Sequence, residues 1–260
     1  MKRLPQAALV CAGAVSRTAL ARLPNLRNHL GPVLSGSLRV SSRTVNVIGG
    51  GWAVASYEDL WTADIIIISV PDTAAETTVK HLAGVKFPWK NRRVILVDSS
   101  RDSAILDPLH ARGAATGSFN FIDHVDGSRV LMEGHTAAIS AMKVLVDRAG
   151  TRSVQVNRGG KTLYLAGLDL AASAMIPLLQ AASQALRLAG IQSREADALV
   201  AGAALRTVGG FSKSQRRAWL PERSAGIEAR AGALAQKSEP LAKFYRQILG
   251  AGVDSMANVS

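Results

Sequence analysis

The chain has 260 residues, 48% of them hydrophobic, and carries 31 Lys and Arg against 19 Asp and Glu, for a formal net charge of +12. This composition excludes a disordered or fibrous protein and suffices for one large domain or two modest ones. The one cysteine, Cys11, excludes an internal disulfide and a thiolate-rich metal site, and it fits a reducing compartment, so a cytoplasmic protein is expected.

The N-terminal residues have two interpretations. Met1, Lys2 and Arg3 precede an apolar run over residues 7–15, which is similar to a short secretory signal. Cleavage near Ala14 would, however, remove the strand and turn that the rest of the domain needs. We therefore expect an intracellular protein.

A strand, a tight turn and a helix are predicted over residues 7–23. An apolar run leads into Cys11-Ala-Gly-Ala-Val-Ser, and apolar residues then recur at helical spacing. In a dinucleotide fingerprint these six positions read G-x-G-x-x-G, and only the second glycine, Gly13, is retained. The turn is expected to contact a cofactor through Cys11, Gly13, Ala14 and Val15, although a side chain at Cys11 stands where the turn is tightest.

The predicted second strand, residues 32–37, is followed by basic residues rather than an acid. Residues 1–57 contain no Asp or Glu, whereas an NAD site places an acid on the ribose about 20 residues past the turn. Ser37, Arg39 and Arg43 fit the 2′-phosphate of NADP, because a planar guanidinium can bind a phosphate through two hydrogen bonds. The alternative is that these are solvated residues of a loop.

The stretch over residues 63–72 contains four consecutive isoleucines. Such a run cannot alternate between core and water, so it predicts a central strand buried on both faces, as in a parallel sheet covered by helices. Ligands of open α/β sheets bind beyond the carboxyl ends of the strands. Val70, Pro71 and Asp72 are therefore predicted to line a cofactor pocket, the alternative being an ordinary strand-to-helix corner.

A capping box of Thr73 and Glu76 is predicted to open the helix that follows, residues 73–82. The alternation of strands and helices then continues to about residue 157. A buried strand at residues 93–98 runs into Ser99 and Ser100, which would face the same edge as Asp72. The remaining predicted elements are strands at residues 52–54 and 117–120, an outer strand at 130–132, and helices at 102–112 and 136–149.

An all-helical second domain is predicted after residue 157. Residues 161–188 form one long apolar stretch, followed by helical patterns at residues 194–205, 222–236 and 241–249. Asp169 and the lack of flanking aromatic belts favour a buried core helix over a membrane span, with an interruption at Pro177. Small residues along this helix predict a homodimer through the C-terminal helices. The expected domains are residues 1–157 and 158–260.

Six segments carry a resemblance to a known family: Cys11-Ala-Gly-Ala-Val-Ser, Ala63-Asp-Ile-Ile-Ile-Ile-Ser-Val-Pro-Asp72, Val97-Asp-Ser-Ser100, Gly117-Ser-Phe-Asn120, Met132-Glu-Gly134 and Lys161-Thr-Leu-Tyr164. To about residue 205 the chain resembles the pyrroline-5-carboxylate-reductase-like NADP-dependent oxidoreductases, in the branch with a helical C-terminal domain of unknown function. The resemblance implies an α/β fold, with a Rossmann-like doubly wound, mostly parallel sheet followed by helices like those of the 6-phosphogluconate dehydrogenase C-terminal domain. The chain departs from the family pattern at Asn120 and Leu165, where histidines are usual, and at residues 172–174, where asparagine is usual.

Candidates for catalysis are few. Lys161 and Tyr164 lie one helical turn apart, and either could donate a proton to a carbonyl or imine that receives a hydride. Ser100 could orient the substrate or the nicotinamide, and Asp169 is a further acid. The alternatives are a solvated Lys161 and a core Tyr164. The five histidines show no metal-ligand spacing, so no metal is predicted.

The leading hypothesis is an NADP-dependent oxidoreductase that reduces a small carbonyl or imine compound. A rival hypothesis is a non-catalytic dimeric protein that keeps the fold as a ligand-sensing or scaffold module, since Cys11, Asn120 and Leu165 replace expected groups. A basic stretch at residues 213–219 raises nucleic-acid binding, but it belongs to no recognised motif and this function is not favoured.

Overall fold

The computed structural model describes residues 6–12, 23, 25–122, 129–146, 152–213 and 226–257. The chain divides into two compact units, Met1–Gly167 and Leu168–Ser260. The domain boundary predicted at residue 157 stays a prediction. Each unit is described below by itself.

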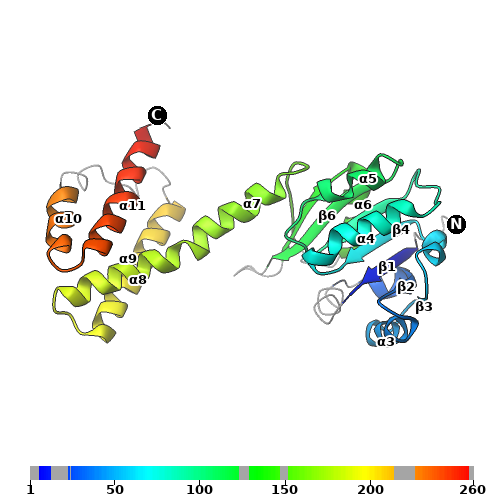
Figure 1. The fold of residues 1–260 in the computed structure, drawn as a ribbon, viewed down its shortest axis with the longest axis horizontal. Coiled ribbons are helices and arrows are strands. Elements are labelled where there is room, and N and C mark those ends of the chain that lie inside the picture. The colour runs from blue at the N-terminus through cyan, green and yellow to red at the C-terminus, as the bar shows by residue number, and fades with distance from the viewer. Residues whose placement is uncertain are drawn as a thin grey trace. The chain divides into compact units, whose positions relative to one another are not determined.

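Unit 1 is built on an eight-stranded sheet with the order β3-β2-β1-β4-β5-β6-β7-β8 (Figure 1). All neighbouring strands are parallel except β6 and β7, which pair antiparallel. The strand bounds are β1 Ala7–Cys11, β2 Leu30–Leu34, β3 Trp52–Val54, β4 Ile65–Ser69, β5 Arg93–Val97, β6 Ala115–Ile122, β7 Arg129–Gly134 and β8 Arg152–Gln155. The first six strands have the order 3-2-1-4-5-6 of a doubly wound dinucleotide-binding fold, which confirms the predicted fold class.

Two apolar cores, one on each face of the sheet, explain why the central strands read as continuous apolar runs. Ile65 and Ile67 of β4 join the core that includes α6 (Thr136–Val146), whereas Ile66 and Ile68 join the core that includes α4 (Asp72–Gly84). All four isoleucines are buried. Because successive strand residues point to opposite faces, both faces of β4 must be apolar.

The other helical elements described in the first 168 residues are short, apart from α3. They are α2 Leu26–His29, α3 Leu38–Ile48, α5 Asp107–His110, α7 Lys161–Leu168, and the 3₁₀ turns η1 Glu58–Thr62 and η2 Ser103–Leu106. The helix predicted over residues 102–112 is therefore η2 followed by α5, with Pro108 in the first turn of α5.

The antiparallel pairing of β6 with β7 brings two glycines face to face at the end of the ladder. Gly117 pairs with Gly134 across the ladder, and a Cβ atom on Gly134 would lie 2.4 Å from the Cα atom of Gly117. Gly134 also has a φ of 129°, which side chains rarely adopt. These two residues set the register of β7, and with it the place of Glu133.

Three local predictions are wrong. The helix α4 begins after Pro71 with no side-chain cap, so Thr73 and Glu76 form no capping box, and Glu76 instead pairs with Lys80 at 2.9 Å. The strand β7 is not outermost, because β8 lies beyond it. The segment Lys161–Leu188 is not a core helix buried by its own chain: none of its most apolar 18-residue window is buried in the single chain.

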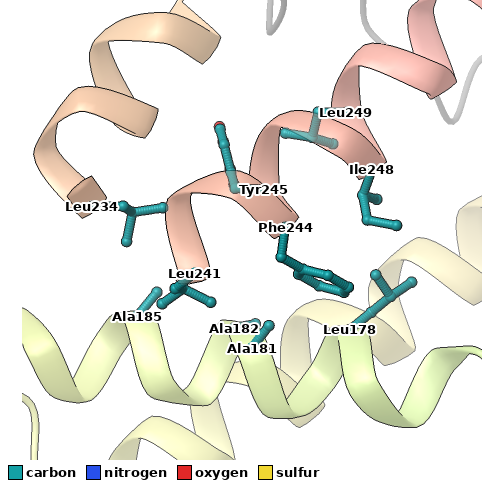
Figure 2. A pocket seen from close by; sticks show the side chains of 10 residues that line it. All are labelled: Leu178, Ala181, Ala182, Ala185, Leu234, Leu241, Phe244, Tyr245, Ile248 and Leu249. Atoms are coloured by element: carbon teal, nitrogen blue, oxygen red, sulfur yellow. The ribbon is translucent and has the colours of Figure 1, made fainter. Parts of the chain in front are cut away.

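The described part of unit 2 is helical, as predicted, with a π-helical turn at Asp169–Ser173 followed by α8 Met175–Leu188, α9 Ser193–Lys213, α10 Ile227–Ala235 and α11 Glu239–Ala257. The irregular turn lies just before Pro177, which has no N–H to give the carbonyl of Ser173, so the predicted interruption is present. Helices α8, α10 and α11 line an apolar groove of about 240 Å³. Figure 2 shows Phe244 and Leu241 of α11 facing the alanines of α8 across it.

We predict that Gly134→Ala lowers the free energy of unfolding by about 2 kcal/mol or more, because the new Cβ meets backbone atoms in a strained conformation. Chemical denaturation measures this loss. The matched control is Gly84→Ala, because a Cβ at Gly84 meets nothing within 4 Å. Equal stability of the two variants would contradict the role given to Gly134.

Candidate active site

Polar residues gather where the parallel strands end. The end of β1 at Cys11 is in register with Ser69 at the end of β4, and the backbone N–H of Ala12 donates to the carbonyl of Ser69 at 3.3 Å. The order of strands reverses between β1 and β4, and ligands of doubly wound sheets bind in the crevice at this point. Val70, Pro71 and Asp72 follow β4 directly, as predicted.

Asp72 is held at this edge by the turn after β5. One carboxylate oxygen accepts a hydrogen bond from the Oγ atom of Ser99, and the other accepts from the Oγ and, at 3.1 Å, the backbone N–H of Ser100. Partial burial opposes ionisation, but these hydrogen bonds and the charge of Lys161 outweigh it and lower the pKa of Asp72. The structure thus brings together Asp72, Ser99 and Ser100, which the sequence placed on separate strand ends.

The turn after β5 has an unusual backbone. Asp98 has a φ of 55°, in the left-handed region, and its N–H donates to the carbonyl of Phe119 at 2.9 Å. The side-chain amide of Asn120 donates to the carbonyl of Ser99 at 3.0 Å, which fixes its orientation. The Oδ1 atom of Asn120 is buried and has no hydrogen-bond partner among the described residues, so it can accept from a ligand or a water molecule.

A fully buried carboxylate, Glu133, lies beneath this turn. Its Oε1 atom accepts from the backbone N–H of Ser103 and the Oγ of Ser118, both at 2.5 Å. Its Oε2 atom accepts from the Oγ of Ser103 at 2.9 Å and the N–H of Gly159 at 3.2 Å. Glu133, Ser103 and Ser118 are all 0% exposed. Four donors satisfy the charge that burial would otherwise make costly.

Lys161, the first residue of α7, is also 0% exposed. Its Nζ atom donates to the carbonyl of Arg101 at 2.8 Å and to the Oγ of Ser118 at 3.3 Å. Burial lowers the pKa of Lys161 to about 8, against the opposing effect of nearby carboxylates, of which Glu133 is the strongest. The solvated Lys161 that the sequence left as an alternative is therefore wrong.

The segment after β2 has the form that the NADP hypothesis expects. Ser37 caps α3 by accepting a hydrogen bond from the N–H of Val40 at 3.3 Å, and the buried Ser41 accepts from the N–H of Ser35 at 2.9 Å. These bonds order the loop between β2 and α3. The side chains of Arg39 and Arg43 are exposed on the first two turns of α3, where they can meet an anion.

The hydrogen bonds of this cluster do not involve Tyr164 or Asp169. Tyr164 is half-buried in unit 1, whereas Asp169 is exposed in unit 2. Gly13, Ala14 and Val15 lie outside the described residues, as does most of the basic stretch 213–219. In the described part of the chain, no group of three His, Cys, Asp or Glu side chains could hold a metal ion.

Sequence reasoning missed Glu133, Ser103 and Ser118 as parts of the site. One signal was present, because Glu133 is the only charged residue between Val130 and Gly134 in an apolar strand. An acid in such a strand needs buried donors. The donors themselves come from separate segments and have no common motif.

We predict that the stability of the protein rises with pH in a way that depends on Lys161. Below a pH of about 8 the folded state must bury an ammonium, whereas between 8 and the ordinary value of 10.5 the folded state releases its proton before the unfolded state does. The free energy of unfolding of the wild type should therefore gain roughly 3 kcal/mol relative to Lys161→Met across this window. Urea unfolding at pH 7, 8, 9 and 10 measures the difference, and parallel pH dependences would count against it.

No protein-family model matches the sequence, and no curated protein matches it significantly. Several solved structures, however, match the structure of this chain. An imine reductase from Bacillus cereus matches with a TM-score of 0.65 and 16% identity over 96% of this chain and 94% of that chain. An imine reductase variant from Myxococcus stipitatus in complex with NAD⁺ matches with a TM-score of 0.66 and 16% identity, covering 96% and 95%.

A reductive aminase from Aspergillus terreus, in complex with NADPH and ethyl levulinate, matches with a TM-score of 0.62 and 13% identity, covering 96% of this chain and 95% of that chain. At these identities the likeness shows a shared fold, a Rossmann-type sheet followed by a helical region. What the chain does must be argued from its own residues.

Proposed function

We propose that this protein is an NADP-dependent oxidoreductase that reduces a small imine or carbonyl compound. The observation that carries the proposal is the cluster of Asp72, Ser99 and Ser100 at the carboxyl ends of β4 and β5, beside the switch point of the sheet. Neighbours of the same fold are imine reductases and a reductive aminase, some of them in complex with NADPH or NAD⁺. The finer assignment to the pyrroline-5-carboxylate-reductase-like branch is part of this proposal.

The residues present fit a dinucleotide with a 2′-phosphate. Ser37, Arg39 and Arg43 at the start of α3 would hold that phosphate, and no acid precedes Glu58 to repel it. The buried Oδ1 atom of Asn120, without a partner in the described part of the chain, would accept from a carboxamide N–H. Val70 and Pro71 would give the ring an apolar wall.

When bound, NADPH supplies the hydride. The chain's own groups orient the reactants and deliver the proton. Ser100, exposed and hydrogen-bonded to the ionised Asp72, would orient the substrate. Tyr164 and Asp169 remain the proposed proton donors, because Lys161 has no surface from which to reach a substrate in the described chain.

Titration with NADPH and NADH, followed by fluorescence, tests this proposal. We expect NADPH to bind at least tenfold more tightly than NADH, since two guanidinium groups favour the phosphate. Arg39→Ala with Arg43→Ala should remove this preference and leave NADH binding unchanged. Arg112→Ala, whose guanidinium stacks on Trp89 instead, is the control. A wild-type protein that binds neither nucleotide at millimolar concentration would contradict the enzyme hypothesis.

The rival hypothesis, a ligand-sensing or scaffold protein, makes a different prediction within the same experiment. Such a protein would bind the nucleotide or another anion without consuming it. Turnover of NADPH with any member of a panel of cyclic imines and keto acids separates the two hypotheses.

We also propose that a second copy of the chain covers the apolar surface of Lys161–Leu188. Leu163, Leu170 and Ile176 are 78%, 74% and 58% exposed, a surface that a soluble monomer rarely leaves open. The segment is long and apolar enough to span a membrane by length and composition. Asp169 lies within it, however, and a carboxylate in a bilayer costs about 3 kcal/mol. The groove of α8, α10 and α11 offers a second copy a matching apolar surface.

Sedimentation of the wild type should show a dimer at micromolar concentration. Leu170→Arg should give a monomer or an aggregate, because it places an unpaired charge in the contact. Val47→Arg is the control, since Val47 is 63% exposed on α3, far from these helices in the sequence. A wild-type monomer would refute the proposal, and association with phospholipid vesicles would favour a membrane instead.

A further inference from the structure

We propose that Glu133 and Lys161 form a buried positioning pair that holds the turn after β5 in place, and with it Ser99 and Ser100 against Asp72. The importance of the pair for cofactor binding rests on the proposed function. The effect of the pair on the order of the turn is independent of the proposed function.

The pair connects five segments of unit 1. Glu133 of β7 binds Ser103 at the start of η2, Ser118 of β6 and the N–H of Gly159 before α7. Lys161 of α7 binds the carbonyl of Arg101. Lys161 and Glu133 therefore hydrogen-bond to the chain just after the turn that carries Ser99 and Ser100. Lys161 binds Arg101, and Glu133 binds Ser103.

Ser118 joins the two charges. Its Oγ atom donates to Glu133 at 2.5 Å and accepts from the Nζ atom of Lys161 at 3.3 Å. The ammonium and carboxylate are thus linked through one hydroxyl in a region with no access to water. A buried charge that loses its partner is strongly unfavourable, so neither can be removed without leaving the other uncompensated.

The turn itself has little other support. Asp98 and Ser100 are exposed. Asp98 has a left-handed backbone conformation, which is unfavourable for residues other than glycine. Two hydrogen bonds fix the turn from the sheet side: the side-chain amide of Asn120 donates to the carbonyl of Ser99, and the N–H of Asp98 donates to the carbonyl of Phe119. The contacts to Arg101 and Ser103 fix its other end. Without them, Ser99 and Ser100 would not hold Asp72 in one orientation.

The test compares the wild type with Glu133→Gln, Lys161→Met and Ser118→Ala. Glu76→Gln is the matched control, because Glu76 is an exposed carboxylate that pairs with Lys80 on the surface of α4. Amide hydrogen exchange is measured for residues 98–106 and, as an internal reference, for β4. This readout needs no cofactor, and it separates local loosening from global loss of stability.

We expect exchange over residues 98–106 to accelerate at least tenfold more than exchange over β4 in Glu133→Gln and Lys161→Met, because β4 reports only the global loss of stability. We expect the control to match the wild type. Ser118→Ala, which leaves Glu133 three donors, should show a smaller effect and serves if the other variants fail to fold. Unchanged protection of the turn in every variant that folds would overturn the proposal.

Two further readouts distinguish positioning from a merely structural role. The dissociation constant or KM for NADPH should rise about tenfold in Glu133→Gln while kcat stays within twofold. In Glu133→Gln, stability should also begin to rise at a lower pH than in the wild type. The substitution removes the carboxylate that favours the charged form of Lys161. Unchanged values of both would count against the pair. If the wild type binds no NADPH but its turn still loosens in Glu133→Gln, the proposed function fails and the positioning pair stands.

Discussion

The carboxylate of Glu133 is the constraint on which the candidate active-site edge of unit 1 depends. A charge with no access to water is tolerated only when donors surround it, and the four donors of Glu133 come from η2, β6 and the approach to α7. Each of these segments must therefore have a fixed position relative to β7. Gly117 and Gly134 are part of the same arrangement, because only glycines let the two antiparallel strands approach closely enough to aim Glu133 at its donors.

This buried network divides the polar residues of the site into two layers. The lower layer, Glu133 with Lys161, Ser103 and Ser118, never meets solvent and determines geometry. The upper layer, Asp72 with Ser99 and Ser100, meets solvent at Ser100 and is available for binding. Lys161, whose pKa burial lowers, therefore lies in the layer that determines geometry, whereas the hydroxyl of Ser100 and the carboxylate of Asp72 lie in the layer open to solvent.

The parts of the fold that the sequence could predict are those in which burial fixes the residue pattern. The isoleucines of β4 had to be apolar on both faces, and the polar residues after β4 and β5 had to share an edge once the strands were parallel. The network of Glu133 could not be predicted, because it depends on the register of β7 and on side chains from distant segments. For Lys161–Leu188, the apolar pattern does not reveal what covers the helix, and in the single chain its most apolar window is not buried.

The four isoleucines of β4 also have a consequence for how the chain folds. The partners of β4 are β1 and β5, and β1 lies far away in the sequence, so the central pairing forms only after a long loop closes. Until then β4 is an uncharged, β-branched segment of the kind that aggregates. Asp64 stands directly before it, and Pro71 with Asp72 follow it after Val70. A charge and a proline at the ends of such a segment oppose its pairing with other chains, so Pro71 and Asp72, which stand at the candidate site in the folded protein, also protect the nascent one.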